Sequence, residues 1–255
     1  MKRRTFCLFG LAAVGHRLYI PKNVHAATSA QVTITCDDTL ASIWNTGALY
    51  NLEVKNRLHV TFFVNPPRIY WGAGYLNLSQ LRRLAANGHE IGAHTINHPH
   101  LTMLSVAQRD SEIGGSMMDL RNNLGFDVRT FAYPYGEYND AVIDSVRKNG
   151  FIAARDTDND LNYPGQTDLY RLHARSLKST TPFTGSGGVK SQIDAAVSGG
   201  GWYILTVHDV DPQGGHDYVP IGTFNLIIDY VASLRNEGKI SVVTLRQGIS
   251  NWFGI

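Results

Sequence analysis

The sequence predicts an α/β fold, a distorted (β/α) barrel of about seven parallel strands in a single domain. Three observations favour it. Strand-like and helix-like stretches alternate with short loops, as in parallel βα units. The chain has 255 residues, 43% of them hydrophobic and 17% charged, and one barrel commonly fills this length. Reactive side chains follow several strand ends, where barrels place their sites. An open doubly wound sheet is the alternative, although no glycine-rich phosphate loop follows the first strand.

Residues 1–26 read as an export signal. A basic start precedes the apolar stretch 6–15, and Val24-His25-Ala26 fits a cleavage site. A disordered or helical extension is the alternative reading. We therefore expect an exported protein (periplasmic, cell-surface or secreted) whose catalytic domain spans 27–255. No other apolar stretch reaches the ~18 residues that span a bilayer, so we expect no stable membrane insertion after signal removal.

Charge and cysteine content limit the possible partners. Without residues 1–26 the chain carries 18 basic and 21 acidic side chains, a net charge of −3. This balance gives no electrostatic footprint for nucleic acid. Only Cys36 then remains, so no internal disulfide is expected. A neutral carbohydrate fits such a surface better than a polyanion does.

The elements follow from periodicity and from capping residues. We expect strands at 32–36, 59–64, 90–93, 130–132, 151–154, 201–207 and 241–244. One helix begins near Leu78, and three others begin after the N-caps Ser105, Asn139 and Thr223. Glycines end these helices, at positions 88, 125, 150 and 238. The segment 156–184 is rich in loops.

Two adjacent carboxylates, Asp37 and Asp38, follow the first strand. Side chains alternate across a strand, so neighbours at its end can point to different partners. One carboxylate can then bind a metal while the other stays free as a base. When the pair is taken alone, a turn or a helix N-cap is the favoured explanation.

Three histidines lie within seven residues, at His94, His98 and His100. One helical turn would place His94 and His98 on the same face, although Pro99 restricts any helix to a short turn. Two histidines with one carboxylate suit Zn²⁺ with an open coordination position. Spacing alone leaves His100 as an alternative to His98, and exposed or structural histidines remain possible.

Two further strand ends carry candidates. Tyr133-Pro134-Tyr135-Gly136 forms a turn whose backbone N–H can face developing negative charge. A plain Pro-Gly turn is the alternative. His208 ends the strand 201–207 and can act as a general acid near neutral pH. A lone histidine in that position is more often structural.

Together and in this order, these pieces resemble the polysaccharide deacetylase family (the NodB-homology domain, carbohydrate esterase family 4) over residues 30–250. The family's motifs appear as Thr35-Cys36-Asp37-Asp38-Thr39, His94-Thr95-Ile96-Asn97-His98, Ala132-Tyr133-Pro134-Tyr135-Gly136 and Leu205-Thr206-Val207-His208. Cys36 and Thr39 replace the usual Phe and Gly. Ala132 stands where many members carry the Arg that orients the free carboxylate.

The resemblance implies a metal site and a set of roles. Asp38, His94 and His98 would hold a divalent metal, with Zn²⁺ expected and Co²⁺ or Ni²⁺ as alternatives. Asp37 would be the base, His208 the acid and the Tyr135 backbone the oxyanion donor. Arg155, at the end of the next strand, is hypothesised to replace the missing Arg. The family's fourth motif, an Asp that tunes the histidine, has three candidates: Asp156, Asp158 and Asp168.

The function implied is removal of N-acetyl groups from an N-acetylglucosamine polymer or oligosaccharide. O-acetyl ester hydrolysis on xylan uses the same site. A metal-independent cyclic amidase is a competing hypothesis, and Ala132 prompts a further one, a carbohydrate-binding protein with a decayed site. Expected substrate contacts are Tyr133, Pro134, Trp202 and Leu205, and the aromatic residues that could stack on sugar rings are Tyr70, Trp71, Tyr75, Tyr133 and Trp202. The oligomeric state is not predicted.

Overall fold

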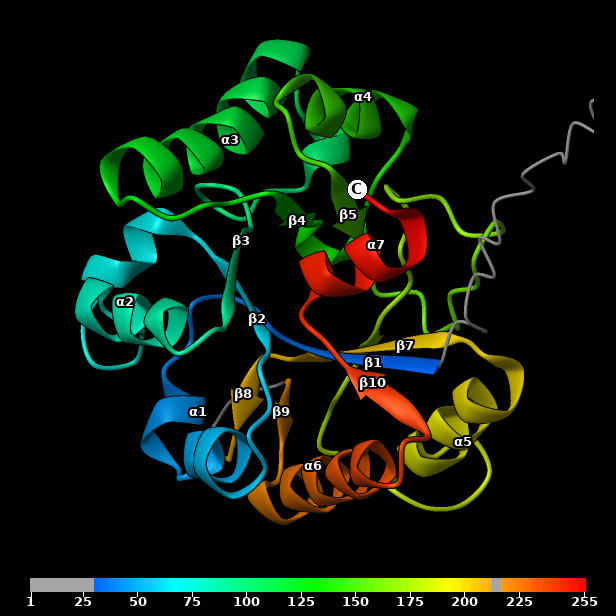
Figure 1. Ribbon diagram of the computed structural model, residues 1–255. Coiled ribbons are helices and arrows are strands. Elements are labelled where there is room, and N and C mark those ends of the chain that lie inside the picture. The colour runs from blue at the N-terminus through cyan, green and yellow to red at the C-terminus, as the bar shows by residue number, and fades with distance from the viewer. Residues whose placement is uncertain (1–29, 212–216) are drawn as a thin grey trace, which may run out of the picture.

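A curled parallel sheet organises the computed structural model, which describes residues 30–211 and 217–255 (Figure 1). Seven strands lie along one path in the order β5-β4-β3-β2-β1-β7-β6, and β10 pairs with β1 beside that path. The prediction of about seven parallel strands in a distorted barrel is confirmed. The strands are β1 (Ala30–Cys36), β2 (Thr61–Val64), β3 (Glu90–Ala93), β4 (Thr130–Ala132), β5 (Ala153–Arg155), β6 (Arg175–Ser176), β7 (Trp202–Val207) and β10 (Ile240–Val242).

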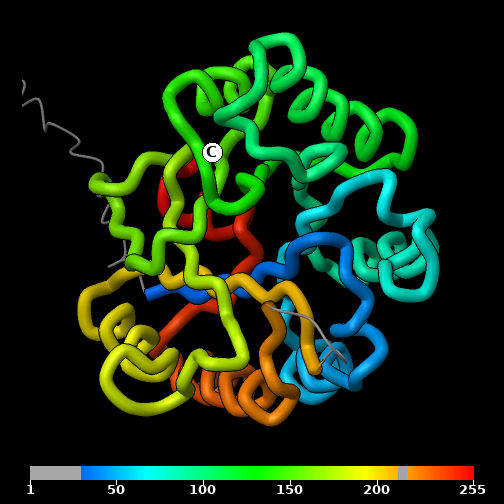
Figure 2. Tube along the Cα trace, turned by 180° about the vertical axis from the view of Figure 1, so that it is seen from behind, coloured from blue at the N-terminus to red at the C-terminus, as the bar shows by residue number. Residues whose placement is uncertain are grey.

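Strand β1 is the centre of the sheet. It pairs with β7 over six residues, and its other edge pairs first with β10 and then with β2. All seven of its residues are buried, as expected for a parallel strand covered on both faces. Most helices lie around the outside of the sheet (Figures 1 and 2), whereas the C-terminal helix α7 (Leu245–Phe253) lies over the middle of the view in Figure 1. β1 therefore carries its carboxyl end, with Asp37 and Asp38, into the middle of the barrel mouth.

The segment between Leu172 and Ser176 joins the two ends of the curled sheet. Leu172 exchanges backbone hydrogen bonds with the Ala154–Asp156 stretch, and three residues later Arg175 pairs with Leu205 of β7. The segment expected to be loop-rich thus contributes β6. This closure brings the end of β5 to the same mouth as β1 and β7.

The helices begin at capping residues in most cases. Ser105 caps α3 (Val106–Met118) and Asn139 caps α4 (Asp140–Lys148), as predicted. α2 (Leu78–Ala86) begins after Asn77. The other helices and minor elements are α1 (Ser42–Asn45), η1 (Tyr50–Lys55), η2 (Pro66–Tyr70), η3 (Leu101–Met103), η4 (Asp119–Asn123), η5 (Pro134–Gly136), α5 (Val189–Gly199), β8 (Asp209–Val210), β9 (Tyr218–Val219), α6 (Ile221–Asn236) and α7 (Leu245–Phe253).

Two boundary predictions are wrong near the C-terminus. Thr223 lies inside α6, which begins two residues earlier, directly after Pro220. Proline has no N–H to lose at a helix start, so Pro220 can precede the first turn. The last strand ends at Val242 rather than at residue 244. Thr244 instead caps α7 in a capping box with Gln247, a helix that the sequence reading missed.

The predicted export signal, residues 1–26, lies outside the described residues. Within the described ranges, no helix combines the length and apolarity needed to cross a membrane.

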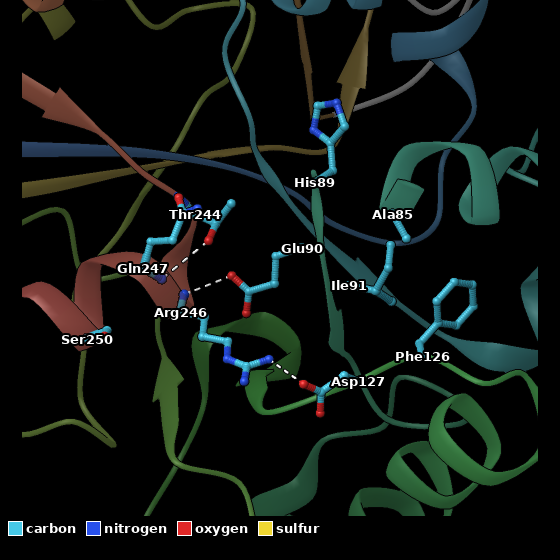
Figure 3. A pocket seen from close by; sticks show the side chains of 10 residues that line it. All are labelled: Ala85, His89, Glu90, Ile91, Phe126, Asp127, Thr244, Arg246, Gln247 and Ser250. Atoms are coloured by element: carbon cyan, nitrogen blue, oxygen red, sulfur yellow. Dashed lines mark hydrogen bonds and ion pairs between the residues drawn. The ribbon is translucent and has the colours of Figure 1, made fainter. Parts of the chain in front are cut away.

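At the amino end of the barrel, a half-buried carboxylate ties the sheet to α7 (Figure 3). Glu90 opens β3 and accepts hydrogen bonds from the hydroxyls of Thr61 and Thr130 and from the Arg246 N–H. Burial raises the pKa of Glu90 above its usual range. The carboxylate borders a cavity of about 490 Å³ at the end of the barrel away from Asp37 and His208. It links β2, β3, β4 and the first turn of α7.

Glu90→Ala should therefore destabilise the fold, because two hydroxyls and one helix N–H lose their acceptor inside the barrel. We expect the free energy of unfolding in urea to fall by about 2–4 kcal/mol. Glu237→Ala is the matched control. It removes an exposed carboxylate that pairs with Lys239, and should change stability by no more than about 0.5 kcal/mol. Equal effects of the two substitutions would contradict this role for Glu90.

Candidate active site

Reactive side chains from separate strands meet at the carboxyl end of the barrel. Asp37 and Asp38 follow β1, His94 follows β3 and His208 follows β7. They line one cavity of about 340 Å³. Its other lining residues are His98, Tyr133, Tyr135, Gly136, Thr157, Ser176, Lys178 and Asp217. The candidates from the sequence that share this cavity are therefore Asp37, Asp38, His94, His98, Tyr133, Tyr135 and His208.

Three of these side chains have metal-binding geometry. The Asp38 Oδ1 lies 3.7 Å from the His94 Nε2 and 3.6 Å from the His98 Nε2. All three ligand atoms lie within 4.8 Å of one another. Atoms spaced in this way can each lie about 2.0–2.2 Å from a single ion. The cluster includes His98, whereas His100 points to Glu137 and stacks on Tyr135.

The protonation of both histidines suits a cation. The His94 Nδ1 lies 2.8 Å from the Ala132 carbonyl oxygen, which can only accept, so Nδ1 donates and Nε2 keeps its lone pair. Burial lowers the pKa of His94 below its ordinary value. Burial and the neighbouring His94 lower the pKa of His98 to about 4. Both rings are therefore neutral at neutral pH, as metal ligands must be.

A non-helical turn aligns the two rings. Thr95 and His98 have φ angles of 62° and 58°. Residues other than glycine adopt this left-handed backbone region only at a cost in free energy. The Thr95 hydroxyl accepts from the His98 N–H at 2.9 Å. Glu112 of α3 accepts from the backbone N–H groups of Ile96 and Asn97. These bonds hold the turn in place, and no helical turn forms.

The other carboxylate of the pair, Asp37, is buried and paired with Arg155. One guanidinium nitrogen of Arg155 donates to the Asp37 Oδ2, and neither side chain is more than 3% exposed. Burial is the largest influence and would raise the pKa of Asp37, but the Arg155 charge and hydrogen bond, together with His94 and His208, outweigh it and the pKa lies below its usual range. The Asp37 Oδ1 is buried and has no hydrogen-bond partner among the described residues. Asp37 is thus ionised, with one oxygen free.

Strand register explains why Arg155 reaches Asp37. Ala132 of β4 and Arg155 of β5 are direct partners in the parallel ladder. The two positions lie side by side at the carboxyl end of their strands, and both residues are fully buried. The structure thus supplies the Asp37 carboxylate with a cation from β5.

His208 faces the same carboxylate from the other side. Its Nε2 lies 4.0 Å from the Asp37 Oδ2, and its Nδ1 lies 3.4 Å from the Ser176 hydroxyl. Neither Asp156 nor Asp168 is its partner: Asp156 contacts His173, and Asp168 accepts from the Tyr170 N–H. Ser176 occupies the place expected for a fourth-motif carboxylate. Asp156, Asp158 and His173 form a second possible metal cluster, outside this cavity.

Tyr135 and Tyr133 lie at the rim of the cavity. Tyr135 has a φ angle of 60° and its ring packs between His98 and His100. Tyr133 is buried, and its hydroxyl donates to the Tyr170 carbonyl oxygen. Both tyrosines line the cavity, and the Tyr135 ring lies next to the histidine cluster.

Three of the four expected substrate contacts are buried away from the cavity. Trp202 opens β7 at the amino end of the strand, far along it from His208, and its indole N–H donates to the Thr33 hydroxyl. The prediction that Trp202 stacks on a sugar is wrong. Leu205 and Pro134 are also buried and do not line the cavity. Among the remaining aromatic candidates, Tyr70 and Trp71 are largely exposed.

The sequence reading missed residues that hold the site together. The Asn65 side chain donates to the carbonyl oxygens of His94 and Thr95. Arg68 pairs with Asp38. Both follow β2, so their place after a strand end was the available signal. Glu112 and Ser176 had none, because one lies in mid-helix and the other on a two-residue strand.

Known proteins share this arrangement of elements. A sequence profile of the polysaccharide deacetylase family matches residues 25–154. A chitin deacetylase of Colletotrichum lindemuthianum is 33% identical over 225 residues, which cover 87% of this chain and 82% of that protein. A peptidoglycan-N-acetylglucosamine deacetylase of Listeria monocytogenes is 26% identical over 54% of this chain. That match spans only 30% of the Listeria protein.

Solved structures agree on the fold. A Mycobacterium smegmatis structure described as a polysaccharide deacetylase superposes with a TM-score of 0.63 at 15% identity, covering 89% of this chain and 91% of that one. A family 4 acetyl xylan esterase of Clostridium thermocellum, solved with cobalt, gives 0.58 at 22% identity, covering 86% and 90%. Given the profile match and the similarity to the chitin deacetylase along most of its length, this chain belongs to the polysaccharide deacetylase family.

Proposed function

We propose that this protein is a metal-dependent hydrolase that removes N-acetyl groups from a polymer or oligosaccharide containing N-acetylglucosamine. One observation carries the proposal. The Asp38–His94–His98 cluster lies in the same cavity as Asp37, a buried ionised carboxylate with one unpartnered oxygen. A cation site beside a free base is the arrangement that hydrolysis of an amide or ester requires.

The donor set suits a divalent ion. One carboxylate and two neutral imidazoles favour Zn²⁺, and the same ligands accept Co²⁺ or Ni²⁺. The bond from the His94 Nδ1 to the Ala132 carbonyl oxygen supports this fit, because it leaves the ligand nitrogen free and fixes the ring. Bound there, the ion supplies Lewis acidity, which makes water a nucleophile near neutral pH and polarises a carbonyl.

Asp37 is suited to take a proton from the attacking water. Its Oδ2 is held by Arg155, and its Oδ1 has no hydrogen-bond partner in the described residues. Arg155, with His94 and His208, lowers the pKa of Asp37 despite its burial, so the carboxylate is ionised at neutral pH. The buried ion pair with Arg155 therefore both orients the Asp37 carboxylate and favours its charged form.

His208 and Tyr135 complete the proposed roles. The His208 Nε2 points toward Asp37 across the cavity, where a protonated ring can donate to the leaving amine. The backbone N–H of Tyr135 can donate to the developing oxyanion. Ser176 accepts from, or donates to, the other nitrogen of His208 and so orients the ring.

The substrate class rests on relatives and on surface charge. The matched proteins are named as deacetylases of chitin and of peptidoglycan N-acetylglucosamine. The net charge of −3 without residues 1–26 suits a substrate that is not a polyanion. Such polymers lie outside the cytoplasmic membrane, which agrees with an exported enzyme. The decayed-site hypothesis is not favoured, because Asp37 has a guanidinium partner in Arg155 although position 132 is Ala.

His94→Ala should abolish metal binding, because it removes one of three ligand atoms. We expect the purified variant to hold less than a tenth of the Zn²⁺ bound by the wild type, measured by plasma emission spectrometry, and to release no acetate. His100→Ala is the matched control, since His100 lies nearby but bonds Glu137. Wild-type metal content in His94→Ala would exclude this site.

Arg155→Ala should leave Asp37 buried without a cation, which raises its pKa and frees its orientation. We expect kcat to fall by roughly 10²–10³-fold. The double variant Ala132→Arg/Arg155→Ala should recover part of this loss, because the two positions are ladder partners. Arg129→Ala, at an exposed ion pair, serves as control. An unchanged kcat in Arg155→Ala would reject the hypothesis that Arg155 replaces the Arg missing at position 132.

Acetate release from chitooligosaccharide, compared with release from acetylated xylan, tests the substrate class. We expect the wild type to prefer the N-acetylated substrate, and Asp37→Asn to lose about 10²–10⁴-fold in kcat while keeping its metal. A preference for acetylated xylan would indicate that the site removes O-acetyl groups and would overturn the proposed N-deacetylation. Full activity of Asp37→Asn would remove Asp37 from the role of base.

A further inference from the structure

We infer that Arg68 weakens the hold of the Asp38–His94–His98 cluster on a divalent cation, so that this site binds and releases its metal more readily than its ligands alone would. The inference rests on the proposed metal site. It concerns a residue outside the recognised motifs, on η2 after β2.

Arg68 bonds the ligand oxygen itself. Its Nη1 lies 2.7 Å from the Asp38 Oδ1 and 3.2 Å from the Asp38 carbonyl oxygen. The Oδ1 is the same atom that faces the Nε2 atoms of His94 and His98. A cation bound by the cluster would therefore share one carboxylate oxygen with a guanidinium.

The guanidinium is held in that position. Its carbon lies 5.6 Å from the ring centre of Trp71 and 6.0 Å from that of Tyr75, distances at which aromatic rings attract cations. Only 16% of the Arg68 side chain is exposed. Pro66 and Pro67 stiffen the turn that carries it. Swinging the charge away from Asp38 would break these contacts.

The acceptor is fixed as well. Asp38 and Thr39 have φ angles of 66° and 62°, and the Thr39 hydroxyl accepts from the Asn65 N–H at 2.9 Å. The carbonyl oxygen of Thr39 accepts from Leu76. The loop after β1 is thus tied to the loop after β2, with Arg68 between them. These contacts oppose the separation of Arg68 from Asp38.

Electrostatics gives the sign of the effect. A divalent ion and a guanidinium on one oxygen repel each other, and in a half-buried site this repulsion is screened less than in water. The repulsion exists only in the metal-bound state, so it lowers affinity. Removing the charge at position 68 should tighten the dissociation constant for Zn²⁺ by about tenfold or more.

Isothermal titration with Zn²⁺ alone tests the inference on the metal-stripped full chain. Arg68→Met removes the charge, and Arg68→Gln removes it while retaining an N–H donor. Both should bind Zn²⁺ about tenfold or more tightly than the wild type, at one ion per chain. Arg68→Lys keeps the charge and should stay within a few fold of the wild type. Circular dichroism checks that each variant is folded.

Arg83→Met is the matched control. Arg83 also pairs with a carboxylate, Glu53, at 3.0 Å and lies over an aromatic ring, Trp44, at 4.6 Å, but it is on α2 outside the cavity. Its variant should bind Zn²⁺ as the wild type does. If Arg68→Met fails to fold, the comparison of Arg68→Gln with Arg68→Lys decides the sign by itself.

Two other results would overturn the inference, each on a different ground. Unchanged or weaker Zn²⁺ binding in both neutral variants would overturn the inference and leave Arg68 as a residue that only orients Asp38. If His94→Ala still binds Zn²⁺ as the wild type does, the metal lies elsewhere. That result would overturn both the proposed site and the role of Arg68.

Discussion

The buried ion pair between Asp37 and Arg155 is the interaction on which the site depends. A carboxylate with about 3% exposure would ordinarily take up a proton, because burial penalises its charge. The Arg155 guanidinium, with His94 and His208 nearby, reverses that outcome and lowers the pKa of Asp37. It reaches Asp37 only because the curled sheet brings the ends of β1 and β5 to one mouth. The fold and the chemistry are therefore linked by a single pair of charges.

Charges alternate around this pair. Asp37 lies between Arg155 and the two histidines His94 and His208, while Asp38 lies between the histidine cluster and Arg68. Each carboxylate thus has an arginine on one side and imidazoles on the other. The difference is in burial: Asp37 is almost fully enclosed, whereas the Asp38 side chain is 18% exposed. Adjacent residues at one strand end thereby lie in different surroundings, which suit the proposed roles of base for Asp37 and metal ligand for Asp38.

Much of this arrangement could be predicted from the sequence. The alternation of strands and helices indicated the barrel, since each parallel strand needs a crossover before the next. The expected cluster of Asp38, His94 and His98 lies together because all three follow parallel strands at the same edge. Arg155 could be suggested because a residue on a neighbouring strand end can reach the same space. The starts of α3 and α4 could also be predicted, because the capping residues that mark them are local signals in the sequence.

The remainder depends on tertiary contacts that leave no local pattern. Trp202 resembles a sugar-stacking residue in composition, but the β7 register buries it against Thr33 and Gly248. Arg68 follows two prolines in an ordinary-looking turn, and only the approach of the loop after β1 gives it a partner. Ser176 lies on a two-residue strand that exists because the sheet closes. Thr223 had cap chemistry, yet Pro220 set the helix start.

Anomalous diffraction at the zinc absorption edge, from crystals grown with Zn²⁺, shows directly whether Asp38, His94 and His98 hold a single ion. We expect one strong peak within about 2.0–2.3 Å of the Asp38 Oδ1 and the Nε2 atoms of His94 and His98, with Asp37 still paired to Arg155. A peak at Asp156, Asp158 and His173 instead, with no peak at the Asp38 cluster, would contradict it.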